Sequence, residues 1–144
     1  MADPISITIA MVTLVPLAVT ACQSLRDAIQ SFQNFPLSVI ELLRETESLQ
    51  AIFTSLRSLV AESEPDLEPD LEMLRAPVLG CSEACRELAA TITKCMRHSG
   101  QSTGSRTSVR DWMMFKIEDK EINRKRNMLA HYKATIEVVM GYIH

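Results

Sequence analysis

The feature that most constrains the fold is an apolar residue at every seventh position towards the C-terminus. Phe115, Ile122, Leu129, Ile136 and Ile143 form this series. A seven-residue repeat along one helix is typical of helices that pack at small crossing angles in bundles. Apolar and polar residues alternate with period two over no useful length, so we expect essentially no sheet.

Turn-forming residues divide the rest of the chain into three further helical segments. Asp3 and Pro4 suit the start of the first helix, while Asn34-Phe35-Pro36 ends it. Pro16 is expected to kink or break this helix. The sequence therefore predicts an all-α, four-helix-type bundle with long first and last helices. The expected helices cover residues 4–33, 37–62, 78–99 and 108–142.

The amino-acid composition predicts two loops that connect the helices. Residues 62–77 carry a near-repeat of Glu, Pro, Asp and Leu, which we interpret as an acidic, solvated loop. Residues 99–107 are rich in Ser, Thr and Gly and form the second expected loop. A chain of 144 residues buries one core without help, so residues 1–144 are expected to form a single domain.

Apolar stripes on the expected helices define a predicted core. On the third helix, cysteines share the stripe with leucine and isoleucine, so we interpret them as buried thiols. A metal site using Cys81, Cys85, Cys95 and His98 is the less favoured alternative. The predicted core comprises Leu42, Leu49, Phe53, Leu56, Leu88, Ile92, Phe115, Ile122, Leu129 and Ile136.

Motifs for catalysis are missing from the sequence. It contains no glycine-rich phosphate loop, no plausible Ser-His-Asp set and no matched pair of Cys-x-x-Cys motifs. We therefore predict a non-enzymatic protein with no catalytic residue, no metal and no cofactor.

The N-terminal segment from Ile5 to Cys22 has no charged residue, which is close to the lower limit for a membrane span. The residues before it include Asp3 and no Lys or Arg, unlike a secretory signal. A buried bundle helix is the favoured interpretation, with a cytoplasmic location and reduced cysteines.

A basic cluster marks the last helix, within a C-terminal half that is basic while the N-terminal half is acidic. Such a cluster is most often a solvated helix face. Attraction to anionic membrane lipids is the sharper hypothesis. Nucleic-acid binding is not expected, because stacking aromatic residues are not interleaved with the charges. The cluster comprises Lys116, Lys120, Arg124, Lys125 and Arg126.

Five segments of the chain carry a resemblance to known families. They are Met1-Ala-Asp-Pro-Ile-Ser-Ile-Thr8, Ser24-Leu-Arg-Asp-Ala-Ile29, Leu43-Arg-Glu-Thr-Glu-Ser-Leu-Gln-Ala-Ile52, Asp111-Trp-Met-Met-Phe-Lys116 and Tyr132-Lys-Ala-Thr-Ile136. In their order and spacing they resemble the N-terminal domain of fungal STAND (NLR-like) proteins, also called HeLo-like. The chain is similar, too, to the N-terminal region of the protein L encoded in azaphilone-pigment gene clusters.

This resemblance implies an N-terminal signalling domain ahead of nucleotide-binding and repeat domains in the full-length protein. Such a domain is expected to self-associate, and its first helix to insert into the plasma membrane on activation, executing programmed cell death. The alternative is a protein–protein adaptor or homo-oligomerisation bundle without membrane activity. A latent membrane inserter must hide its first helix, whereas a docking module displays an apolar patch there. The candidate inserting residues are Ile5, Ile9, Val12, Leu14 and Val15.

Overall fold

A computed structural model describes residues 4–30, 37–62, 68–95 and 109–143. These residues form four α-helices and no strand: α1 (Pro4–Gln30), α2 (Leu37–Ala61), α3 (Glu68–Cys95) and α4 (Val109–Ile143). The all-α fold and its long first and last helices are therefore confirmed. The expected loop at 99–107 lies outside the described residues.

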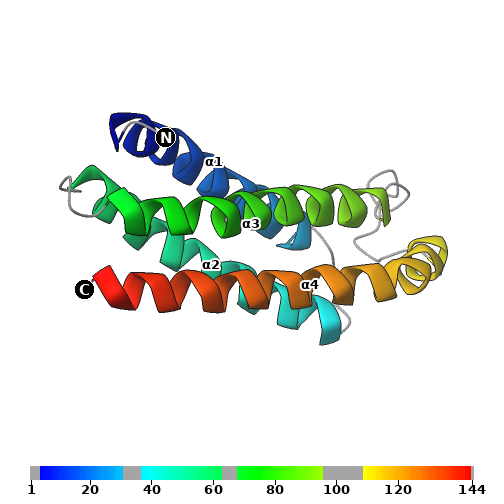
Figure 1. The fold of residues 1–144 in the computed structure, drawn as a ribbon. Coiled ribbons are helices and arrows are strands. Elements are labelled where there is room, and N and C mark those ends of the chain that lie inside the picture. Colours follow the sequence, from blue (N-terminus) through cyan, green and yellow to red (C-terminus); the bar gives the residue numbers. More distant parts are fainter. Residues whose placement is uncertain (1–3, 31–36, 63–67, 96–108, 144) are drawn as a thin grey trace.

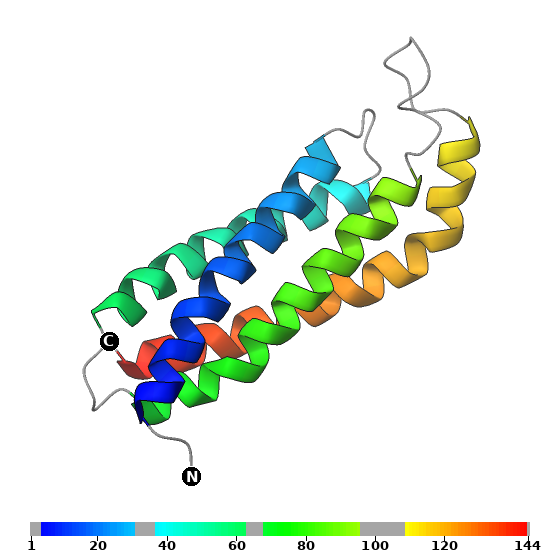
Figure 2. The same cartoon turned by 90° about the horizontal axis from the view of Figure 1, so that it is seen from above.

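The helices run alternately up and down, so α1 begins and α4 ends at the same end of the bundle (Figure 1). α1 packs mainly against α3 and α2, and α4 packs mainly against the same two helices. α1 and α4 consequently lie on opposite sides of the bundle, as the turned view in Figure 2 also shows.

The predicted core is confirmed wherever its side chains are described. Nine of the ten expected residues are fully buried, and Phe115 lies outside the residues with described side chains. Burial of one such aliphatic side chain stabilises the fold by about 1.5–3 kcal/mol relative to exposure. The nine are Leu42, Leu49, Phe53, Leu56, Leu88, Ile92, Ile122, Leu129 and Ile136.

The acidic loop predicted at 62–77 is wrong over most of its length, because α3 already begins at Glu68. Pro69 falls in the first turn of the helix, where a missing N–H costs little. Leu71, Leu74 and Val78 are fully buried, and they extend the stripe of Cys81 and Cys85 at steps of three and four. Burial of these side chains outweighs the hydrogen bond lost at Pro77, which lies inside the helix.

Pro16 does not break α1, which continues as one helix on both sides of the proline. The expected end of this helix at residue 33 lies outside the described residues. Buried residues of α1 recur at helical spacing, so one face is held by the core: Met11, Val15, Ala18, Cys22, Leu25 and Ile29.

Candidate functional site

The outward face of α1 displays three large apolar side chains. Ile9 is 59% exposed, Val12 52% and Leu17 54%. We call these three residues the α1 strip. Exposed Thr13 lies between them and donates a hydrogen bond from Oγ1 to the carbonyl of Ile9 at 3.1 Å, so its own polar group is satisfied.

The candidate inserting residues therefore fall into different environments. Ile9 and Val12 are exposed, Leu14 is half-buried and Val15 is fully buried. The side chain of Ile5 lies outside the described residues. The sequence argument missed Leu17, which follows from continuing the outward face by one helical turn.

α1 also contains a segment, Ile9–Gln30, that is long and apolar enough to cross a membrane. It is the one such segment among the described residues, and 33% of its apolar window is buried. Core helices of soluble proteins share these properties.

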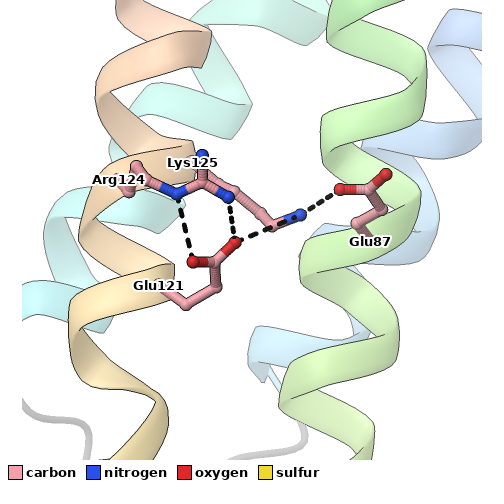
Figure 3. Close-up of polar contacts among 4 residues, drawn as sticks. All are labelled: Glu87, Glu121, Arg124 and Lys125. Carbon is pink, nitrogen blue, oxygen red and sulfur yellow. Dashed lines mark hydrogen bonds and ion pairs between the residues drawn. The ribbon is translucent and has the colours of Figure 1, made fainter.

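The basic cluster of α4 is engaged in ion pairs with neighbouring helices. Lys125 contacts Glu87 of α3 and lies 3.6 Å from Glu121 of its own helix, with only 12% of its side chain exposed (Figure 3). Arg126 pairs with Glu41 of α2, and 24% of its side chain is exposed. These two cations therefore point towards acidic groups of the bundle.

About two turns further along α4, Lys133 reaches α2 in the same way. Its Nζ lies 3.0 Å from Oε1 of Glu45. That oxygen is buried and has no partner in good hydrogen-bond geometry, so we treat the contact as an ion pair without a directed hydrogen bond. Three cations of α4 thus face carboxylates of α2 and α3, which the sequence argument did not foresee.

Two further residues of the basic cluster, Arg124 and Lys120, are more accessible. Arg124 is exposed and donates hydrogen bonds to Glu121, one of them from Nε at 3.0 Å (Figure 3). The guanidinium of Arg124 lowers the pKa of the Glu121 carboxyl, which stays charged. Lys120 is exposed, and the side chain of Lys116 is outside the described part of the chain.

A pair of thiols joins α1 to α3 inside the core. Sγ of Cys22 lies 3.9 Å from Sγ of Cys85, and Cys81 is buried one turn earlier on α3. Burial raises the pKa of Cys81 to about 12. The contact with Cys22, followed by burial, raises the pKa of Cys85 as well. Such thiols stay protonated and are poor nucleophiles and metal ligands.

A family profile gives the relationship of this chain to known proteins. The family described as "Pigment biosynthesis cluster protein PigL N-terminal" matches residues 2–144. The chain belongs to this family. No curated protein and no solved structure matched the chain.

Membership in the PigL N-terminal family supports the likeness to pigment-cluster proteins noted in the sequence. The relationship to HeLo-like domains of STAND proteins stays a prediction. The described part of this PigL N-terminal domain contains no group of three or more His, Cys, Asp or Glu side chains suited to a metal ion. The two candidate interaction surfaces are therefore the α1 strip and the basic face of α4, where Lys125, Arg126 and Lys133 form ion pairs with α2 and α3.

Proposed function

We propose that this domain is a non-catalytic interaction module that self-associates through the α1 strip. The observation that carries the proposal is the exposure of Ile9, Val12 and Leu17 in the folded bundle. A helix kept in reserve for membrane insertion would hide these residues. The exposure of these three side chains favours docking to another protein chain, which the sequence analysis gave as the alternative to membrane insertion.

A second copy of the chain is the partner that this surface fits best. α1 carries no charged residue before Arg26, so two strips can meet without removing a charge from water. The domain as a whole has a formal charge of -3, and a neutral face avoids the repulsion between like copies. Three side chains make a small contact, so we expect weak association that strengthens when copies are tethered in a larger assembly.

Sedimentation velocity over a concentration series tests this proposal. The wild-type domain should show a weight-average sedimentation coefficient that rises with concentration. Replacing Val12 and Leu17 with Glu should abolish the rise, because like charges would meet in the contact. Val138→Glu with Tyr142→Glu is the matched control, because it adds the same two charges at residues that are 61% and 80% exposed on α4, across the bundle from α1. A wild-type coefficient that does not change with concentration would refute self-association.

Membrane-directed cell killing is the second candidate function. The apolar segment Ile9–Gln30 supports it, because this segment has the length and composition to enter a bilayer. In this account, the domain is the effector of a STAND protein, and clustering by downstream nucleotide-binding and repeat domains precedes insertion at the plasma membrane.

The thiol pair offers a way to separate the two functions. Refolding the denatured domain in the presence of diamide, a two-electron thiol oxidant, would form a Cys22–Cys85 disulfide that ties α1 to α3, because the two sulfurs lie only 3.9 Å apart in the folded bundle. Leakage of anionic vesicles that the disulfide suppresses, and that reduction restores, would support insertion of α1. The Cys85→Ser domain, treated with the same oxidant, is the control. Self-association that survives in the locked domain, without leakage, would favour the interaction module.

A further inference from the structure

One cavity among the described residues combines apolar walls with a cationic rim. It lies between the N-terminal half of α1 and the last turns of α2, and its volume is about 170 Å³. Pro16 and Ala61 bring small side chains to this wall, so the space between the two helices is not filled from within. The lining residues are Met11, Val12, Val15, Pro16, Arg57, Val60 and Ala61.

The size of the cavity limits what it can hold. An engineered apolar cavity of about 150 Å³ accommodates benzene, so this space fits about six carbon atoms or a little more. Among the apolar lining residues, Val12 is 52% exposed, Pro16 is half-buried and Val60 is nearly buried, whereas Met11 and Val15 have no exposed surface. A hydrocarbon chain entering the cavity would therefore displace water from surfaces that cannot hydrogen-bond to it.

The positive charge of Arg57 at the rim indicates that the polar end of a ligand is an anion. Arg57 is exposed and forms no ion pair with any described residue, unlike Lys125 and Arg126. A guanidinium binds a carboxylate through two parallel hydrogen bonds, and it needs no prior release from an acidic partner here. The rim thus suits an anionic head on an apolar tail.

We propose that this cavity binds a medium-chain carboxylate, with the alkyl chain against Val12, Pro16 and Val60 and the carboxylate on Arg57. The cavity shares Val12 with the α1 strip, but it is formed within a single copy of the chain and needs no second copy. Its occupation is measured on the monomer, so failure of one proposal leaves the other standing.

Octanoate titrated into dilute domain labelled with ¹³C at its methionine methyl groups provides the test. Because Met11 is buried at the cavity, its methyl resonance should shift in a saturable way, whereas that of exposed Met73 should not. Arg57→Gln should weaken octanoate binding about tenfold, as expected for loss of a charge-assisted hydrogen bond. Octanamide has the same alkyl chain without the charge, so it should bind the wild-type and Arg57→Gln domains with equal affinity.

Two further variants make the outcome decisive. Arg44→Gln removes an exposed arginine from α2 far from the cavity and should leave octanoate binding unchanged. Val60→Phe should fill the cavity and abolish binding of both compounds, and circular dichroism checks that this variant is folded. A Met11 resonance that does not move below the critical micelle concentration would overturn the proposal. Equal octanoate affinities for the wild-type and Arg57→Gln domains would overturn it too.

Discussion

The ring of Tyr132 on α4 packs directly against the backbone of Gly80 on α3. A Cβ atom at position 80 would lie 2.6 Å from Cζ of that ring and 2.9 Å from Cε1 and Cε2. A Cβ atom essentially never lies this close to a non-bonded carbon, so the two helices approach closely here only because residue 80 is glycine.

Gly80→Ala should therefore destabilise the domain by about 1–3 kcal/mol, as overpacking does elsewhere. Tyr132 is half-exposed, and some outward movement of its ring should keep the loss towards the lower value. With Tyr132 also replaced by Ala, the same change should stabilise α3 by about 0.5–1 kcal/mol, because alanine is the better helix former. Urea denaturation of the four proteins measures both values. A loss of the same size in both backgrounds would show that the ring is not responsible.

Leu129→Ala tests the seven-residue repeat from which the fold was predicted. Leu129 is fully buried, so truncation should lower the free energy of unfolding by about 2–5 kcal/mol. Ala130 is exposed one residue further along, and Ala130→Ser should change stability by less than about 0.5 kcal/mol. Similar small effects at both positions would mean that the stripe is misassigned.

Apolar spacing predicted the helices well, because burial of leucine and isoleucine dominates the stability of a bundle. The loop predicted at residues 62–77 was wrong because its prolines and acidic residues were given more weight than the apolar spacing. Leu71, Leu74 and Val78 already continue the apolar stripe of Cys81 and Cys85. The basic cluster of α4 was visible in the sequence, but its partners were not. Glu41 and Glu87 lie far from Arg126 and Lys125 along the chain, so only the packing of α4 against α2 and α3 reveals the pairs.

The buried thiols should be unreactive in the native domain. Cys22, Cys81 and Cys85 should be modified by a thiol reagent such as DTNB only as fast as the domain unfolds. The folded pKa of Cys81 is about 12 against an ordinary 9.0, so its stabilising effect is complete below pH 9 and is lost as the pH rises towards 12. Melting temperatures from pH 8 to 11 should fall less steeply for Cys81→Ala. Rapid modification of these three thiols at pH 8, measured in a Cys95→Ser background, would contradict their burial.

The ion pairs of α4 should limit attraction to anionic lipids. Replacing Glu41 and Glu87 with Gln frees Arg126 and leaves Lys125 paired only with Glu121 of its own helix, and each freed cation near a membrane is worth about 1 kcal/mol, or about fivefold in affinity. Co-sedimentation with vesicles containing phosphatidylserine measures the gain. Glu47→Gln with Glu137→Gln changes the net charge equally at exposed positions for which the structure shows no ion pair. Equal gains in the two double variants would mean that net charge, and not release of the two cations, governs binding.

The central claim, that two copies meet through the α1 strip, is tested most directly by a distance between spin labels. Thr13→Cys in a Cys95→Ser background places a label in the strip, while the buried native thiols stay unlabelled. Double electron–electron resonance at associating concentrations should give a short intermolecular distance from position 13. A label introduced by Val138→Cys should give a long distance or none. A short distance from position 138, or no intermolecular coupling at position 13 while the domain is associated, would contradict the account.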